Sequence, residues 1–481
     1  MKLRILLVGF LACMSFTPTT ELETAFVLYD QYEQFVEKSI KDRRFKHQDV
    51  LSVLRKVKGQ NGIEVSKVGR SIEGRSINLV KVGNGPIKVL MWSQMHGDEP
   101  TATMTIMDLL NFFARSNDEF ADIRAKLESE LTIYFLPMLN PDGAERYQRR
   151  NALGVDLNRD ALRLQTPEAA TLKRVRDSLQ ADWGFNLHDQ GRHYTVGHSG
   201  KNATFSFLAP AYNKEKNVND IRQRAMQLIT LMDGVAQEFL PGQVAKYDDA
   251  FEARAFGDNM QSWGTSTILV ECGGLKGDPE KQYIRRIQYV MFLTALEAIV
   301  DGSYADQSVR DYYEIPQNTR NLMDLIVRNA QLEVNGYSFL MDLGFRYEEI
   351  NYSGARRFYK QSQLYDLGDL STYSGYQELD AHGMQIEEGK MYPEIVDDLA
   401  TVRSFNVKEL FSQGYTDIRV RKMPPKSLVY NLPFRLHAAS KKNVANEVRL
   451  WRNPSFLLVG EDGRRKFAIV NGTSYRLEDY K

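Results

Sequence analysis

The chain has 481 residues, of which 43% are apolar and 26% are charged, and its formal net charge at pH 7 is zero. This length allows two or three domains with an ample core, and the composition is that of an ordinary globular protein. The balanced charge excludes a long-range electrostatic pull toward nucleic acid or anionic membranes, so neither is expected as a partner.

The first twenty residues have the pattern of a secretory signal peptide. A short basic segment, residues 2–4, precedes the apolar residues 5–16 and the polar residues 17–20. We therefore expect a secreted or periplasmic protein. A lipid anchor on Cys13 is the alternative, and in either case Cys272 is the only other cysteine, which predicts no intrachain disulfide after processing. No later segment is long and apolar enough to predict a transmembrane span.

Residues 21–58 are predicted to form an N-terminal helical segment that packs on the next domain. That domain is expected over residues 59–303, where short strands rich in β-branched and aromatic residues alternate with helical patterns. The predicted strands relevant to function are residues 87–93, 131–136, 183–187 and 266–270.

The strand predicted at 87–93 leads into a candidate metal-binding pair, His96 and Glu99. Pro100 follows and suits the first turn of a helix, predicted over residues 101–114. The pair therefore lies at a strand-to-helix turn, where an imidazole nitrogen and a carboxylate can reach one ion. His188, after the strand at 183–187, completes a His2Glu set. Three protein ligands leave a position open for water, which is typical of a catalytic zinc.

Two further polar motifs follow predicted strands. Residues 140–143, Asn-Pro-Asp-Gly, come after the strand at 131–136 and lead on to residues 156–159, Asp-Leu-Asn-Arg, while Glu271 follows the strand at 266–270. Ligands of open α/β sheets bind at the carboxyl ends of the strands, so these motifs are expected to converge with the histidines on one site.

A different domain is predicted over residues 317–481, after a boundary near Ser303 and an acidic linker. Its segments look short, alternate polar with apolar residues and are punctuated by glycines, which favours a β-rich accessory domain. Its aromatic residues are most simply core. A carbohydrate-binding or wall-binding surface is the alternative.

The chain resembles the M14 family of zinc carboxypeptidases, the family of carboxypeptidase A, from about Phe45 to Ser303, and the leader suggests a secreted bacterial type. The resemblance is carried by the four motifs in order and by residues 69–77, which look like the first hairpin of the family. It implies an α/β fold: a mixed sheet flanked by helices, here followed by the β-rich accessory domain.

The resemblance also implies roles for individual residues. One Zn²⁺ per chain would be held by His96, Glu99 and His188, and Glu271 would be the general acid/base. The remaining positions concern the substrate: Arg149 would polarise the scissile carbonyl, with adjacent Arg150 as the alternative, Asn158 and Arg159 would bind the terminal carboxylate, and Tyr247 is the nearest candidate for the tyrosine that closes over the substrate.

The expected function is a zinc metallocarboxypeptidase that hydrolyses C-terminal residues from peptides with a free terminal carboxylate, such as cell-wall stems or dietary and host peptides. Two alternatives stay open: a zinc-dependent deacylase of small N-acyl amino acids, and a non-catalytic module that binds peptide termini on the same fold. The loop over residues 247–264, which contains Arg254, Phe256, Asp258 and Met260, is expected to line the pocket for the terminal side chain.

Overall fold

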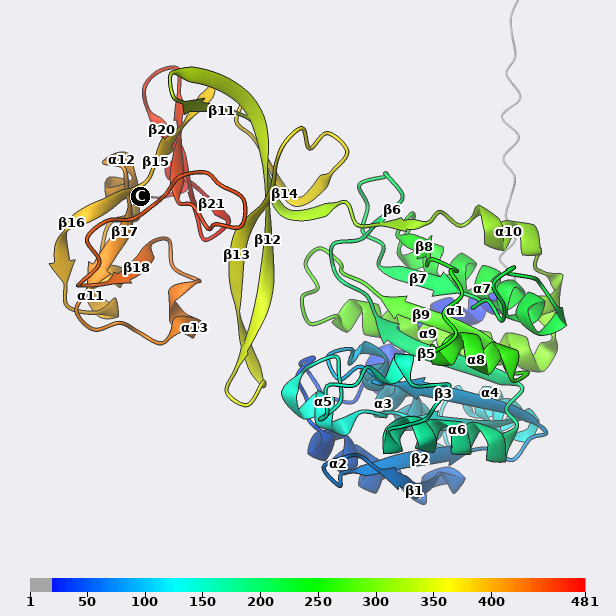
Figure 1. Ribbon diagram of the computed structural model, residues 1–481. Helices are drawn as coiled ribbons and strands as arrows, with labels where there is room; N and C mark the ends of the chain where they lie inside the picture. Colours follow the sequence, from blue (N-terminus) through cyan, green and yellow to red (C-terminus); the bar gives the residue numbers. More distant parts are fainter. Residues whose placement is uncertain (1–19, 481) are drawn as a thin grey trace, which may run out of the picture.

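The computed structural model describes residues 20–480 and has two parts, an α/β part and a β-rich part that lie side by side (Figure 1). Residues 1–19 of the predicted signal peptide, with Cys13, lie outside the described residues. Within residues 20–480, no helix is both long and apolar enough to cross a membrane.

A mixed eight-stranded sheet forms the centre of the α/β part of the described chain, in the order β1-β2-β4-β3-β5-β9-β7-β8. Strands β4, β3, β5 and β9 run parallel, whereas β1 and β2 pair antiparallel with their neighbours, and β7 pairs antiparallel with β9 and parallel with β8. The bounds are Glu64–Arg70 (β1), Ser76–Val82 (β2), Ile87–Ser93 (β3), Leu131–Leu136 (β4), Trp183–Asp189 (β5), Phe205–Leu208 (β7), Val244–Lys246 (β8) and Ser266–Cys272 (β9).

Helices cover both faces of this sheet, and each face has its own apolar core. In β3, Val89 and Met91 point into the larger core while Leu90 and Trp92 point into the smaller one, because successive side chains of a strand alternate between faces. The larger core is supplied by α1 (Thr20–Asp30), α2 (His47–Val57), α3 (Thr101–Phe113), α4 (Ala121–Glu130), α7 (Asp220–Phe239) and α9 (Gln282–Asp301); the smaller core is supplied by α6 (Pro167–Leu179) and α8 (Phe256–Ser262).

The predicted elements around the motifs are confirmed, with one systematic difference. The strands at 87–93 and 131–136 and the helix after Pro100 have the expected bounds within one residue. The other two strands are longer than predicted, since β5 continues to Asp189 and β9 to Cys272. His188 and Glu271 therefore lie within strands rather than after them.

The N-terminal segment is helical over α1, α2 and a short 3-10 helix at Tyr32–Gln34, whereas residues 35–46, which the prediction of a largely helical segment also covered, are not helical. Tertiary hydrogen bonds replace helical ones there. Asp108 on α3 accepts a hydrogen bond from the backbone N–H of Glu37 at 2.7 Å, and Asn111 donates to the carbonyl of Phe35 at 3.1 Å. These bonds hold the apolar side chains of the segment in the larger core.

The region after residue 317 is β-rich, as predicted. Its larger sheet has the order β13-β12-β11-β15-β19-β20-β21, with β14 added to β11, and a smaller sheet has the order β16-β17-β18. The bounds are Leu322–Val334 (β11), Tyr337–Tyr352 (β12), Arg357–Gly368 (β13), Ser374–Asp380 (β14), Met384–Glu388 (β15), Lys390–Val396 (β16), Tyr415–Val420 (β17), Arg435–Ala438 (β18), Phe456–Gly460 (β19), Arg465–Val470 (β20) and Thr473–Arg476 (β21), with helices Leu399–Arg403 (α11), Val407–Ser412 (α12) and Lys426–Val429 (α13).

The expectation of uniformly short strands was wrong, because β11, β12 and β13 have 13, 16 and 12 residues. The spacing of the glycines in the sequence suggested that each one ends a strand, but this is not so in the structure. Gly336, at φ +80°, lies in a hairpin turn, but Gly344 lies inside β12, where an added Cβ would come within 2.9 Å of the Leu370 side chain. Close packing, rather than a turn, requires glycine at that position.

The segment between the two parts packs against the α/β part. Helix α10 (Val309–Glu314) carries Tyr312, which is buried with Ile315 in the larger core of the α/β part. Next in the chain, β10 (Asn318–Thr319) pairs with β6 (Thr195–Val196). Residues 304–316 therefore belong physically to the α/β part.

Polar contacts hold the β12–β13 hairpin against the α/β part. Glu349 on β12 pairs with both Arg43 and Arg44 at 2.8 Å, and the Arg44 guanidinium lies over the ring of Tyr147 at 4.0 Å. The hairpin reaches down toward α5 (Pro141–Arg146) (Figure 1).

We propose that the β-rich region is an accessory unit that the α/β part does not need for folding. A chain ending at Pro316 should be soluble and cooperatively folded, whereas a chain ending at Ser303 should be less stable or insoluble because it loses Tyr312 and Ile315 from the core. Expression of both chains and thermal unfolding by circular dichroism would measure this. Repeated insolubility of the longer chain would contradict the proposal.

Candidate metal centre and active site

Three buried donor groups meet at the carboxyl end of the central sheet. They come from His96, Glu99 and His188, whose ligand atoms all lie within 4.8 Å of one another. The two histidine Nδ1 atoms are 3.2 Å apart, and the Glu99 carboxylate lies 2.8 Å from Nδ1 of His96 and 2.7 Å from Nδ1 of His188. Two imidazoles and one carboxylate form the donor set of a catalytic zinc site.

The turn that carries His96 and Glu99 depends on close packing at Gly97. A Cβ at this position would lie about 2.0 Å from the backbone of Gly143 in α5, so only glycine fits. The motif at residues 140–143 supports the same turn, since Asn140 caps α5 by accepting a hydrogen bond from the N–H of Gly143 at 2.9 Å and donates to the carbonyl of Met95 at 3.2 Å. The Asn-Pro-Asp-Gly motif thus shapes the site without entering it.

Asp156 is a site residue to which the sequence analysis assigned no role. Its carboxylate lies 3.0 Å from Nε2 of His96 and 3.0 Å from Nη2 of Arg149, and it also accepts a hydrogen bond from the backbone N–H of Asn158. Metal-binding histidines usually donate their second N–H to a carboxylate, which fixes the ring orientation. That rule, applied to the acidic residue in the Asp-Leu-Asn-Arg motif, could have identified it.

The electrostatics of the cluster fit a bound cation. Burial lowers the pKa of His96, but the charge of Glu99 and the bond to Asp156 raise it to about 9. Burial raises the pKa of Glu99, but His96 and His188 together lower it by a larger amount, so the net shift is downward. Without a metal, a proton on His96 therefore compensates the buried carboxylate. A divalent cation held by the same three groups would take over this compensation, and binding would release the proton.

Glu271 lies beside His188 because the two residues are paired in the register of β5 and β9. Its side chain is buried, and burial together with the negative charge of Glu99 raises its pKa well above the ordinary value. A carboxyl group in such an environment accepts and returns a proton more readily than an exposed glutamate.

Arg149 also reaches the cluster, with Nη1 3.2 Å from the Glu99 carboxylate and 3.1 Å from Nδ1 of His96. Adjacent Arg150 instead donates to the carbonyl of Gly154 at 3.0 Å, away from the donor set. Of the two alternatives considered from sequence, only Arg149 is among the residues that line the cavity.

A cavity of about 250 Å³ connects these groups with Asn158, Arg159 and Tyr247. Asn158 accepts a hydrogen bond from the backbone N–H of Phe256 at 2.8 Å. Arg159 pairs through Nε with Glu252 at 3.2 Å and donates through Nη1 to the carbonyl of Asn158. Its Nη2 group has no hydrogen-bond partner among the described residues and is available to a ligand.

The loop over residues 247–264 lines the cavity, but not with all of the residues expected. Asp258 does so, and burial raises its pKa to about 6. Phe256 and Met260 instead belong to the smaller core, and Arg254 is exposed and pairs with Glu252 at 3.1 Å. The expectation for these three residues was wrong because α8 begins at Phe256 and turns its apolar face to the sheet.

Tyr247 extends from the end of β8 into the cavity. Its backbone N–H donates to the carbonyl of Phe207 at 2.8 Å, which fixes the start of the loop. Burial, followed by the charge of Glu271, raises the pKa of its phenol, so the group is a neutral hydrogen-bond donor at physiological pH.

Part of the chain is similar to known carboxypeptidases. Residues 50–216 match the family model described as zinc carboxypeptidase. An uncharacterized protein of Zymomonas mobilis is 24% identical over 147 residues, 30% of this chain and 37% of the relative. Carboxypeptidase 2 of Trichophyton rubrum is 31% identical over 148 residues, 29% of this chain and 26% of the relative. The matched region is thus well under half the length of each of these relatives.

Among solved structures, a metallo-carboxypeptidase from Burkholderia cenocepacia is 16% identical, with a TM-score of 0.44, and the match covers 54% of this chain and 70% of that chain.

The donor set predicts that His188→Gln loses zinc, because two protein ligands do not hold the ion tightly. We expect zinc to fall from about one ion per chain to a small fraction of that in elemental analysis after buffer exchange. His193→Gln is the matched control, since His193 lies five residues on and pairs with Asp324 rather than with the donor set. Stoichiometric zinc in His188→Gln would rule out this assignment.

Proposed function

We propose that this chain, whose residues 50–216 match the zinc carboxypeptidase family model, is a metallocarboxypeptidase that removes C-terminal residues from peptides. One observation carries the proposal: the candidate metal donors, the buried carboxyl of Glu271 and the Asn158–Arg159 pair all line the same cavity. The sequence pattern of residues 1–20 supports export of the protein.

The metal donors of the proposal are His96, Glu99 and His188, with Asp156 orienting the first of them. A zinc ion, when bound, lowers the pKa of a bound water from 15.7 to roughly 7 and so makes a nucleophile available at neutral pH. The buried position of the three donors keeps competing water away from the site.

Glu271 would move the proton in this reaction. Its buried side chain beside His188 would take a proton from the attacking water and deliver it to the leaving amine, a role worth about 10² to 10⁴ in rate. Arg149 would donate hydrogen bonds to the scissile carbonyl oxygen as negative charge develops there, since its guanidinium already faces the donor set.

Arg159 and Asn158 would select the end of the peptide. A guanidinium binds a carboxylate in a planar, bidentate manner, and Glu252 already occupies one edge of the Arg159 guanidinium with its own carboxylate. A substrate carboxylate would bind Nη2 and the amide of Asn158. Tyr247 would close the cavity over the terminal residue.

The small volume of the candidate active-site cavity is compatible with one alternative function. A volume of about 250 Å³ holds roughly one amino-acid residue, so a deacylase of small N-acyl amino acids would fit the same groups. A module that only binds peptide termini would use the arginine and asparagine but has no need of a buried proton-transfer group such as Glu271.

Glu271→Gln should retain zinc and lose about 10²-fold or more in kcat, because the change removes the proton-transfer group and no ligand. Steady-state kinetics with parallel zinc analysis would measure both effects. Asp248→Asn serves as the control, since it neutralises an exposed carboxylate that lines the same cavity. Turnover that stays the same in Glu271→Gln would exclude Glu271 as the base.

Peptides with a free C-terminus should be hydrolysed at least about tenfold faster, in kcat/KM, than their C-terminal amides, because each lost charged hydrogen bond weakens binding substantially. Arg159→Ala should remove most of this preference, while Arg163→Ala, an exposed arginine four residues on, should keep it. Equal values for free and amidated peptides in the unmodified protein would overturn the exopeptidase proposal, and activity limited to single N-acyl amino acids would favour the deacylase.

A further inference from the structure

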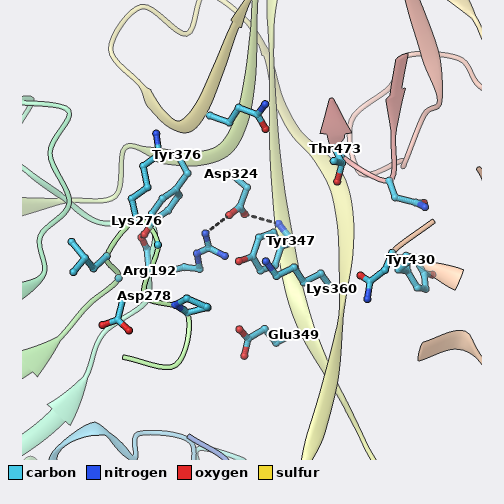
Figure 2. Close-up of a pocket in the computed structure, with 18 of the residues that line it drawn as sticks. Arg192, Lys276, Asp278, Asp324, Tyr347, Glu349, Lys360, Tyr376, Tyr430 and Thr473 are labelled. Carbon is cyan, nitrogen blue, oxygen red and sulfur yellow. Dashed lines mark hydrogen bonds and ion pairs between the residues drawn. The ribbon is translucent and has the colours of Figure 1, made fainter. Parts of the chain in front are cut away.

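A second and larger cavity, of about 710 Å³, lies between the two parts of the chain (Figure 2). One wall comes from the α/β part, with Arg43, Arg192, residues 274–279 and Lys281. The other wall comes from the β-rich part and includes, among others, Tyr347, Glu349, Lys360, Tyr376, Tyr430 and Tyr475.

This cavity is adjacent to the candidate active site through the chain that follows His188. Asp189, Gln190 and Gly191 line the small cavity, and Arg192, the next residue, lines the large one. Lys281 reinforces the connection, because its Nζ atom lies 3.1 Å from the carboxylate of Asp189. The loop after His188 thus leads from the candidate metal donors to the large cavity.

The acidic side chains of the large cavity already have partners within the described residues. Asp324 pairs with Arg192 at 2.7 Å and accepts a hydrogen bond from the backbone N–H of Tyr347 at 2.8 Å (Figure 2). Glu349 pairs with two arginines, as described above. Asp278 accepts hydrogen bonds from the first N–H groups of α9, including that of Gln282 at 2.7 Å. Two of the three carboxylates are thus paired with arginines, and the third is directed at backbone N–H groups.

Two lysines of the lining, in contrast, have no anionic partner. Lys276 is exposed and makes no ion pair or hydrogen bond through its side chain within residues 20–480. Lys360 is also exposed, and its Nζ atom rests over the ring of Tyr347 at 4.3 Å without an ion pair among the described residues. Partial desolvation of its amine by the surrounding side chains and the neighbouring charge of Arg192 lower the pKa of Lys360, and an anion at this position would oppose that shift.

The tyrosines of the cavity are already in contact with other side chains. The guanidinium of Arg192 lies 4.1 Å from the ring of Tyr347 and 4.4 Å from that of Tyr376, and Tyr430 stacks on Tyr359 with centroids 5.1 Å apart. Sugar-binding sites offer aromatic faces to the ligand. Here the groups that remain available are cationic, which favours an acidic ligand over a neutral glycan.

We propose that the large cavity binds an acidic segment of the peptide substrate, upstream of the residue that is removed, through Lys276 and Lys360. This inference rests on the proposed carboxypeptidase function and specifies its substrate class. The β-rich part then contributes to substrate selection, since Lys360 and most of one wall belong to it.

The test compares two peptides that differ only at the third and fourth residues from the C-terminus, which are both Glu in one and both Gln in the other. At low ionic strength the acidic peptide should have a kcat/KM about fivefold or more higher, mainly through KM, and added salt should reduce the ratio. The double variant Lys276→Gln/Lys360→Gln should bring the ratio close to one. The ratio is measured within each variant, so partial loss of stability does not change it.

Lys441→Gln/Lys442→Gln is the matched control, because it removes two positive charges from the β-rich part at residues that do not line the cavity. It should keep the preference for the acidic peptide. A ratio near one in the unmodified protein, or the same loss of preference in both double variants, would overturn the proposal.

Calorimetric titration of the acidic peptide into the Glu271→Gln protein separates this inference from the proposed function. Tight binding that depends on Lys276 and Lys360 supports the inference, even if no peptide is hydrolysed and the proposed function fails. Hydrolysis of peptides without any binding that depends on the two lysines would overturn the inference but would leave the proposed function intact. Binding of a neutral oligosaccharide in place of the acidic peptide would also overturn it.

Discussion

The parallel hydrogen-bond ladder of β3, β5 and β9 is the constraint on which the candidate site depends. The ladder puts His188 directly beside Glu271, and it places the end of β3, with the turn that carries His96 and Glu99, at the same edge. A slip of one residue between β5 and β9 would turn one of the two side chains to the opposite face of the sheet. The buried apolar residues on both faces hold the register, so the two cores of the α/β part also fix the geometry of the site.

Buried charge at the site is balanced by buried charge around it. Within the site, Asp156 and Glu99 are compensated by His96 and Arg149. Behind it, Asp108 on α3 and Arg285 on α9 form a fully buried ion pair, and Asp108 also accepts a hydrogen bond from the hydroxyl of Tyr32 at 2.8 Å. Removing one partner of such a pair typically costs about 3–5 kcal/mol, because the other charge is left buried alone. The pair therefore anchors α3, which begins directly after the Glu99 turn, and joins the N-terminal segment to the α/β part.

The contact between the two parts has a different character. It combines a short strand pair, β6 with β10, and charged or aromatic groups such as Arg44 and Glu349, with little of the apolar burial that defines a domain core. Polar interfaces of this kind are typical of domains that fold separately. Such interfaces also leave space between the two parts. In this protein the space is a cavity next to the candidate active site, and two of its lysines have no anionic partner within residues 20–480. This arrangement is the basis of both proposals for the β-rich part, as an accessory unit and as a contact for the substrate.

Much of the α/β part could be predicted from local sequence. The strands at 87–93 and 131–136 and the helix after Pro100 follow from alternation, chain length and proline position, which are properties of a few neighbouring residues. The candidate metal donors could be identified because two histidines and a glutamate, which have zinc-binding chemistry, lie at or just after the ends of two predicted strands. By contrast, the long strands β11 to β13 were not predicted, because Gly344 interrupts the sequence pattern but serves close packing against Leu370 in the structure.

What only the tertiary structure decided was which side chains meet. The choice of Arg149 over Arg150, the bond between Asp156 and His96, and the assignment of Phe256 to the core all depend on residues far apart in the chain. The large cavity depends on the packing of two parts that no local pattern describes. Sequence by itself determined the elements and the chemical types of the candidate site residues, since these follow from local propensity and side-chain chemistry. The distances between them required the fold, because distance between remote residues is set by packing.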